Sequence, residues 1–342
     1  MQFTFNEEQI ALKHSAGKFL KAHAAPEKLL LQSPDDSALL WKQIAQELGW
    51  TALIIPERFG GLGLSQVELS ALMEEMGSQL CSAPFFSTVC LYSNTILLGA
   101  NEEQKNEILP KISNGNCRGS LAYLEKGQFW NHEEIETTAT PDGSSYRLQG
   151  TKTLVLDGEN ADSFIVAART PETHGVAGVS LFLVPADAKG LHRESLPTLD
   201  ISRPMARVSL DSVLISEDSR IGAEGKGGII LDRALSLAGI SLSAEQVGGA
   251  QRCLDMAVDY SMERHQFGRP IGSFQAIKHK CADMLLRVES ARSAAYYAAW
   301  SAKAAPDELS EASLVAQSYC SEAFFHCAAE NIQIHFAPQS WH

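Results

Sequence analysis

Residues 262–284 read Met262-Glu-Arg-His-Gln-Phe-Gly-Arg-Pro-Ile-Gly-Ser-Phe-Gln-Ala-Ile-Lys-His-Lys-Cys-Ala-Asp-Met284 and determine how the last third of the chain folds. The run ends one long helical pattern, turns through Gly268, Pro270 and Gly272, and opens a second helical pattern. An arginine, an aromatic residue and a glutamine therefore lie together where two long helices meet.

The helical pattern continues on both sides of this turn. Residues 226–342 contain three apolar patterns of helical period, and an alanine-rich stretch around Tyr296 suits close helix packing. We expect an antiparallel helix bundle with helices at Ile229–Arg264, Phe274–Ala304 and Leu309–Ile334.

The middle of the chain has a different pattern. Residues 116–225 contain short runs rich in β-branched and aromatic residues, separated by clusters of Gly, Pro, Asp and Asn. In the last run, we expect the side chains of Val208, Leu210 and Val213 to face the core. We expect a small antiparallel β domain with strands at Tyr146–Leu148, Ser163–Ala168, Val179–Val184 and Val208–Ile215.

The first part of the chain is again helical in pattern. Residues 1–115 show apolar stripes of helical period, and two helix starts have a local signature. Ser65 with Glu68 forms a capping-box pattern, and Asn101 with Gln104 marks another helix start. The expected domains are therefore 1–115, 116–225 and 226–342.

Composition excludes several function classes. The chain has 342 residues, a net charge of −13, 45% hydrophobic and 20% charged residues, which is typical of a globular protein. The negative charge argues against nucleic acid as a partner. No apolar run reaches the roughly 20 residues of a membrane span, and no secretory signal is visible. We expect a cytoplasmic protein that is not inserted in a membrane.

Neither a metal site nor a hydrolase is indicated. The seven cysteines are scattered, form no Cys-x-x-Cys pair and are odd in number, so we expect reduced, buried thiols. The chain contains no Gly-x-Ser-x-Gly and no His-Glu-x-x-His motif.

Arg264-x-x-Phe267-Gly268, followed by Phe274-Gln275, resembles the cofactor-binding turn of the acyl-CoA dehydrogenases. Three other pieces are similar to the family, and with the helical–β–helical order the resemblance covers almost the whole chain. These pieces are Pro56-Glu-x-x-Gly-Gly-x-Gly, Leu109-Pro-x-Ile-x-x-Gly115 and Gly248-Gly-Ala-Gln-Arg-x-Leu-Asp255. The resemblance implies bound FAD and the oxidation of acyl-CoA thioesters.

The resemblance assigns the cofactor-binding residues. Arg264 would contact the FAD diphosphate across a subunit interface, where a guanidinium gives forked hydrogen bonds. Phe267 would pack on the adenine, and the helix that begins at Phe274-Gln275 would offer its N-terminal N–H groups to an anion. The alternative is a surface arginine beside a core phenylalanine.

Gln333 matches the family glutamine that meets a neighbouring subunit's FAD. The family continues with Gly-Gly-x-Gly-Phe, whereas this chain continues Phe336-Ala-Pro-Gln-Ser-Trp-His342. We expect a shortened C-terminal bundle, either truncated or a natural short variant.

The family's catalytic base has no counterpart in this chain. One family position lies beyond the last residue, and the other falls on Ala238, with Gly239 in place of an adjacent arginine. Neither side chain can accept a proton. Gly239 suggests extra room beside the substrate. Glu245, about two helical turns later, is a displaced base or an ordinary helix carboxylate.

The loops that hold the flavin ring are also altered. The family's Thr-Glu-Pro loop corresponds to residues 121–130, where Tyr123 and Trp130 line a site or simply pack in the β domain. The family's Trp-Ile-Thr loop is Leu154-Val-Leu-Asp-Gly158, so Leu156 replaces the ring-binding hydroxyl.

The family residues that this chain retains are those that the family donates to a neighbour's FAD. The family residues that it lacks are those that hold the flavin ring and accept the proton. We therefore expect a complementing subunit of a heteromeric acyl-CoA dehydrogenase acting in lipid or steroid catabolism, with a second dehydrogenase chain as partner and an electron-transfer flavoprotein as acceptor. One alternative is a self-sufficient homo-oligomeric dehydrogenase with a displaced base. Another is a non-enzymatic assembly or binding module.

Overall fold

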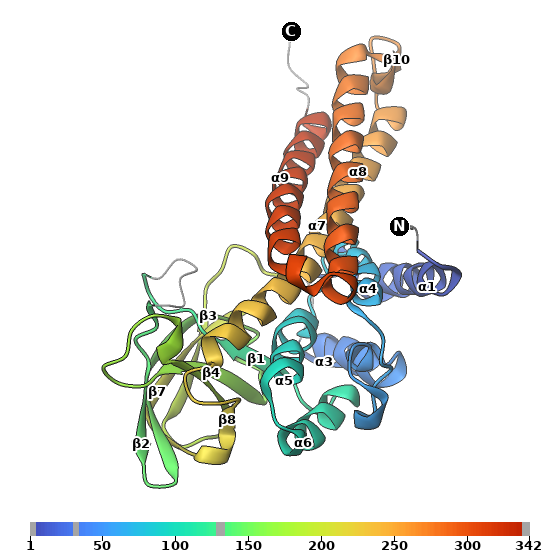
Figure 1. The fold of residues 1–342 in the computed structure, drawn as a ribbon. Coiled ribbons are helices and arrows are strands. Elements are labelled where there is room, and N and C mark those ends of the chain that lie inside the picture. The colour runs from blue at the N-terminus through green and yellow to red at the C-terminus, as the bar shows by residue number, and fades with distance from the viewer. Residues whose placement is uncertain (1–4, 30–33, 128–133, 337–342) are drawn as a thin grey trace. The chain divides into compact units, whose positions relative to one another are not determined.

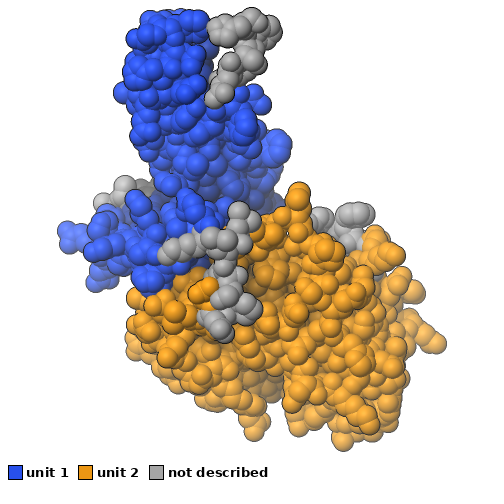
Figure 2. Space-filling view, turned by 180° about the vertical axis from the view of Figure 1, so that it is seen from behind, with its two compact units in different colours: residues 1–28, 65–81, 239–342 blue, residues 29–64, 82–238 orange. Residues whose placement is uncertain are grey.

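The computed structural model describes residues 5–29, 34–127 and 134–336. The chain forms two compact units, which Figure 2 shows in different colours. Unit 1 comprises residues 1–28, 65–81 and 239–342, and unit 2 comprises residues 29–64 and 82–238. The division into domains 1–115, 116–225 and 226–342 stays a prediction, and Trp130 lies outside the described residues.

Unit 1 is helical, and three long helices dominate it (Figure 1). These three begin and end within two residues of the ranges expected from the apolar pattern. The elements are α1 (Glu7–His23), α4 (Gln66–Ser78), α7 (Gly227–Glu263, in unit 1 from Gly239), β9 (His265–Gln266), β10 (Arg269–Pro270), η8 (Ile271–Ser273), α8 (Gln275–Ala304), η9 (Pro306–Glu308) and α9 (Leu309–His335).

Small residues let the bundle helices approach one another. Ala295, Ala298 and Ala299 on α8 are buried, and the thiol of Cys320 on α9 donates to the carbonyl of Ala291 at 3.4 Å. The alanine-rich stretch around Tyr296 therefore packs as the sequence indicated. The seven cysteines form no disulfide, but only four are buried, because Cys81, Cys253 and Cys281 lie at partly exposed positions.

Helix α7 is long and apolar enough to cross a membrane by length and composition. However, 61% of its most apolar window is buried by protein. That burial is what the core helix of a folded domain shows.

Helices α4 and α7 cross in backbone contact at two glycines. A Cβ added to Gly248 would lie 1.8 Å from the carbonyl oxygen of Glu74, and one added to Gly77 would lie 1.9 Å from that of Glu245. Real Cβ atoms do not approach a backbone oxygen so closely, so a larger residue would push the two helices apart.

Gly248→Ala is expected to lower the free energy of unfolding by about 2 kcal/mol, because the overpacked contact is backbone and cannot rotate away. Gly17→Ala is the matched control, since its added Cβ meets only the side-chain end of Glu75. Urea unfolding followed by circular dichroism measures both variants. Equal stability of the two variants would contradict the close crossing.

Unit 2 combines short helices with one sheet (Figure 1). Its helices are α3 (Pro34–Lys42), η1 (Gln43–Glu47), η2 (Trp50–Ala52), η3 (Glu57–Phe59), η4 (Phe86–Ser93), α5 (Asn94–Gly99), α6 (Glu102–Ser113), η6 (Val176–Gly178) and η7 (Glu217–Ser219), and α2 (Pro26–Leu29) ends in it. Its strands are β1 (Gly119–Ala122), β2 (Thr138–Asp142), β3 (Ser145–Leu156), β4 (Ser163–Arg169), β5 (Val179–Pro185), β6 (Leu191–Leu196), β7 (Met205–Ser216) and β8 (Arg220–Ile221).

The eight strands run in the order β6-β7-β3-β2-β4-β5-β8, and β1 pairs with β4. Most pairs are antiparallel, as expected, but β1 and β2 each run parallel to β4. Val208, Leu210 and Val213 all point into the core of the sheet. A positive φ of 53° at Ser212 explains why the last two inward positions are three residues apart.

Both predicted helix starts are confirmed. The Ser65 hydroxyl and the Glu68 carboxylate form a capping box at α4, and Asn101 with Gln104 forms another at α6. Each box satisfies backbone N–H groups that have no partner inside the helix.

Candidate functional site

The turn at residues 264–275 forms a small hairpin at one end of the bundle (Figure 1). Gln266 of β9 pairs with Arg269 of β10, and the two residues between them have positive φ, 53° at Phe267 and 78° at Gly268. A bulky residue at positive φ is strained. The Phe267 side chain is also 92% exposed. The fold therefore holds an aromatic ring in solvent at the tip of a strained turn.

Arg264 connects the end of α7 to this hairpin. Its backbone N–H donates to the carbonyl of Tyr260, and its own carbonyl accepts from the N–H of Ile271, both at 2.8 Å. The side chain is partly exposed, and it forms no ion pair with any residue in the described ranges. Its guanidinium charge is therefore available to a ligand that is not part of this fold.

Phe274 and Gln275 begin the next helix. The Arg269 guanidinium lies over the Phe274 ring at 4.2 Å, and Phe267 approaches the same ring edge-on at 6.1 Å. Phe274 thus packs against its own hairpin and the bundle core. Gln275 is exposed at the first turn of α8, whose N-terminus has no side-chain cap.

Gln333 lies at the same end of the bundle. It is exposed on the last turns of α9, where the His335 ring stacks on Tyr260 of α7 at 4.2 Å. Tyr260 is one turn before Arg264, so the structure brings the end of α9 next to the end of α7. The five residues that the sequence assigned to the cofactor therefore share one end of unit 1.

The position of the family base holds no proton acceptor. Ala238 is buried, and the following residue is Gly239. The expected extra room at Gly239 is wrong, because a Cβ there would lie 2.2 Å from the side-chain nitrogen of Gln317 and 2.8 Å from the Ser313 hydroxyl. The space is filled by α9.

Glu245 lies where α7 crosses α4, with its carbonyl oxygen against Gly77. Its side chain is half-buried. The position is set by helix packing within unit 1, which agrees with an ordinary helix carboxylate.

A buried ion pair, which the sequence reasoning did not single out, lies inside unit 2. Lys152 is fully buried and its Nζ lies 2.5 Å from Oε1 of Glu125, which is 7% exposed. Burial lowers the pKa of Lys152 to about 8, and Glu125 opposes the shift. Burial would raise the pKa of Glu125, but Lys152 and its hydrogen bonds hold it below the usual range. No local pattern indicated the pair, because Lys152 lies among polar residues of β3 and Glu125 lies beyond the end of β1.

The end of β3 and the turn after it depart from ordinary strand geometry. Leu154 has a φ of 50° and is 48% exposed, and Asp157 has a φ of 53°. The Asp157 carboxylate accepts a 2.6 Å hydrogen bond from Ser87, and burial raises its pKa. Leu156 is half-buried, and its carbonyl accepts from Ser120. The side chain at the family's ring-binding position is therefore aliphatic.

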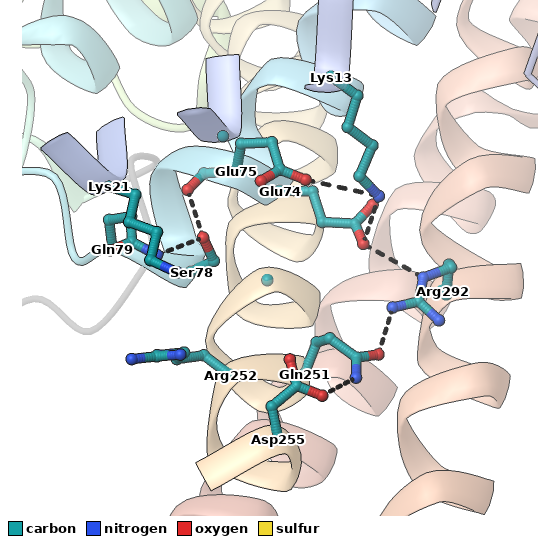
Figure 3. Close-up of a pocket in the computed structure, with 12 residues that line it drawn as sticks. Lys13, Lys21, Glu74, Glu75, Ser78, Gln79, Gln251, Arg252, Asp255 and Arg292 are labelled. Atoms are coloured by element: carbon teal, nitrogen blue, oxygen red, sulfur yellow. Dashed lines mark hydrogen bonds and ion pairs between the residues drawn. The ribbon is translucent and has the colours of Figure 1, made fainter. Parts of the chain in front are cut away.

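A polar pocket of about 340 Å³ in unit 1 was also not predicted (Figure 3). Its centre is Glu74, which is 3% exposed and pairs with Lys13 at 2.8 Å and Arg292 at 3.2 Å. Tyr296 donates to the same carboxylate at 2.6 Å, and burial followed by the Glu74 charge raises the pKa of Tyr296. Because two cations already neutralise Glu74 and a phenol donates a hydrogen bond to it, we assign it a structural role.

Three family models match nearly the whole chain. The acyl-CoA dehydrogenase N-terminal domain matches residues 6–116, the middle domain residues 120–213 and the C-terminal domain residues 225–337.

Individual proteins agree with these matches. A glutaryl-CoA dehydrogenase from Desulfococcus multivorans is 34% identical over 268 residues, which is 77% of this chain and 68% of that protein. The structure of PigA with FAD and proline has a TM-score of 0.90 at 26% identity and covers 100% of this chain and 90% of its own.

A third similar structure is a complex of unlike chains. The ChsE4-ChsE5 complex from Mycobacterium tuberculosis has a TM-score of 0.87 at 27% identity, with 98% of this chain and 88% of that chain covered. Together with the fold and the hairpin, these matches show that the chain belongs to the acyl-CoA dehydrogenase family of FAD-dependent oxidoreductases.

Proposed function

We propose that this chain is the complementing subunit of a heteromeric acyl-CoA dehydrogenase. It contributes its hairpin end to an FAD that a second dehydrogenase chain holds, and that second chain supplies the base. The observation that carries the proposal is the exposed Phe267 next to Arg264, which has no ion pair among the described residues, in a chain with Ala238 at the position of the base.

The residues present fit one half of FAD better than the other. At the hairpin, Arg264 offers a guanidinium to the diphosphate and Phe267 offers an aromatic face to the adenine. Bound FAD would supply the electron acceptor for the α,β-dehydrogenation of an acyl-CoA. In unit 2, Leu156 offers no hydroxyl to the flavin ring, so the ring half is better served by another chain.

The similarity to the ChsE4-ChsE5 complex supports an assembly of unlike chains. The substrate is then an acyl-CoA, in keeping with the glutaryl-CoA dehydrogenase relative. We further propose a cytoplasmic role in lipid or steroid catabolism, with an electron-transfer flavoprotein as acceptor. The net charge of −13 disfavours attraction of the anionic CoA at long range, so binding of CoA would depend on basic residues close to its site.

Reconstitution tests the proposal. The purified chain alone should bind less than stoichiometric FAD and show no acyl-CoA oxidation. Mixed with a second acyl-CoA dehydrogenase chain from the same organism, it should co-purify, show the yellow flavin bands and oxidise an acyl-CoA. Stoichiometric FAD and turnover by the chain alone would show that the proposal is wrong, and a colourless mixture would favour a non-enzymatic module.

Glu245→Gln separates the proposal from a self-sufficient enzyme. We expect turnover of the reconstituted complex to stay within about twofold of wild type, whereas loss of a catalytic base costs about 10²–10⁴-fold. Steady-state kinetics with the same acyl-CoA measures the change. A loss in the larger range, with flavin content and melting temperature unchanged, would identify Glu245 as a displaced base.

A further inference from the structure

Positive charge gathers at the hairpin end of an acidic chain. The whole chain has a net charge of −13, yet residues 264–280 contain four Lys and Arg residues and no Asp or Glu. One of these four, Lys280, pairs with Glu330 of α9. The other three form no ion pair with any residue in the described ranges. Charge that is segregated in this way favours an anionic partner at this end.

Two of the three remaining cations lie beside the same aromatic ring. The Arg269 guanidinium lies over the Phe274 ring at 4.2 Å, and Lys278 follows Phe274 by one helical turn. Both basic residues are exposed. We call Arg269, Phe274 and Lys278 the basic patch. Its two like charges repel each other, and an anionic surface placed against them would relieve that repulsion.

The start of α8 adds to the positive charge of the basic patch. The N-terminus of α8 has no side-chain cap and no acidic residue in its first turn. Because a helix N-terminus carries a partial positive charge, a lysine near it is unfavourable within the chain. The acidic residues that border this run, Glu263 and Asp283, pair with neither cation of the patch in the part of the chain that the structure describes.

The diphosphate of FAD does not account for all of this charge. The proposed function places the diphosphate on Arg264, which precedes the basic patch along the chain. The three cations and the N-terminus of α8 together exceed the charge of one diphosphate. The cations of the basic patch are therefore available to a second anionic group beside the cofactor.

We propose that Arg269 and Lys278 dock on an acidic surface of the second dehydrogenase chain, beside the FAD that Arg264 contacts. This inference rests on the proposed function, to which it adds the chemistry of the partner's surface. The Phe274 ring gives the basic patch an apolar centre, and aromatic and arginine side chains are enriched in the cores of protein interfaces.

The position of the basic patch favours the second dehydrogenase chain over other occupants. Arg269 belongs to strand β10 of the hairpin itself, so the basic patch is continuous with the surface that the proposed function places against that chain. Charge complementarity across an interface acts mainly on the rate of association and on the choice of partner. The basic patch would therefore help this chain to select an unlike subunit.

Association kinetics test the basic patch. The second dehydrogenase chain, kept with saturating FAD, is immobilised for biolayer interferometry, and the full-length chain is added at several salt concentrations. The association rate constant of the wild type should fall about tenfold or more between low salt and about 0.5 M NaCl. Lys278→Glu should lower the rate constant at low salt about fivefold or more and weaken its salt dependence, because the reversed charge would face acidic groups.

Three further variants make the test specific. Lys303→Glu makes the same charge change at an exposed position in the last turn of α8, and it should leave the rate constant unchanged. Lys278→Arg keeps the charge and should stay within about twofold of wild type. Arg269→Ala removes one charge without reversing it and should lower the rate constant about threefold. Circular dichroism confirms that every variant is folded.

Several outcomes would overturn the proposal. The first is a wild-type rate constant that does not depend on salt, and the second is a Lys278→Glu variant that associates as fast as Lys303→Glu. The third is a Lys278→Glu variant that associates normally but binds FAD more weakly, which would assign the lysine to the cofactor. Salt-dependent self-association that is lost on Lys278→Glu would assign the basic patch to a second copy of this chain.

Failure of the proposed function gives a different result. In that case the wild-type mixture itself lacks co-purification and flavin bands, and both proposals are wrong. If only the basic patch is wrong, the wild-type mixture still co-purifies with flavin, and the charge variants associate like the wild type.

Discussion

Replacing Arg264 with alanine in the reconstituted complex is expected to weaken FAD binding on the order of a hundredfold, because the diphosphate loses a desolvated, charge-assisted pair. Within the described residues the guanidinium forms no ion pair that would compete with the diphosphate. Flavin fluorescence titration measures the dissociation constant, and the ratio of flavin to protein after gel filtration gives an independent readout.

The adjacent arginine supplies a matched control. Arg269 lies on the same hairpin, but its guanidinium lies over the Phe274 ring at 4.2 Å. Arg269→Ala should therefore change hairpin stability more than FAD affinity. Arg264→Lys should recover part of the loss, since lysine supplies charge without the forked geometry. If Arg264→Ala binds FAD as tightly as wild type, the hairpin does not contact the cofactor and the proposed role of this end is wrong.

Local patterns allowed much of the fold to be predicted. The capping boxes at Ser65 and Asn101 depend on residues three positions apart, so the sequence alone predicts where α4 and α6 begin. Strand β7 was predictable because Val208, Leu210 and Val213 face one core. Strand β6 was missed because it is an edge strand with charged, exposed residues, and such strands carry no apolar alternation.

Contacts between distant residues explain what could not be predicted. The hairpin residues Arg264, Phe267 and Phe274 follow one another in sequence, so their proximity follows from a single turn. Glu74 and Arg292 are 218 positions apart, and no local pattern indicates that they meet. The parallel pairing of β1 and β2 with β4 could not be predicted either, because it too joins segments that are separated in sequence. The filling of the space at Gly239 by Gln317 also required the packing of α9 to be known.

Lys152→Met is expected to lower the free energy of unfolding by about 3–5 kcal/mol at neutral pH, because it leaves a carboxylate buried without its cation. Glu125 would keep its hydrogen bonds from the backbone N–H of Glu136 and Thr137 and from the Thr137 hydroxyl. These bonds do not neutralise the charge. Urea unfolding followed by circular dichroism measures the loss.

Two further comparisons test whether burial of the ion pair causes the loss of stability in Lys152→Met. Lys152→Met combined with Glu125→Leu should recover most of the stability, since an apolar pair of similar volume replaces a buried ion pair at little cost. Arg207→Met, which breaks the exposed pair with Glu194, should cost no more than about 1 kcal/mol. A loss no larger for Lys152→Met than for Arg207→Met would contradict the buried pair.

The pH dependence of the Lys152→Met loss follows from the carboxylate. In the wild type, burial raises the pKa of Glu125, but Lys152 and the hydrogen bonds together lower it by more. The folded-state pKa of Glu125 is therefore below the unfolded value. The stability that ionised Glu125 contributes is therefore present above the unfolded pKa and is lost as the pH falls through the lowered folded pKa. In Lys152→Met the cation is gone and burial leaves the pKa of Glu125 higher than in the wild type. The difference in stability should therefore shrink as the pH falls from the pKa of Glu125 in the folded variant to its lowered pKa in the folded wild type, because a protonated Glu125 no longer needs a cation.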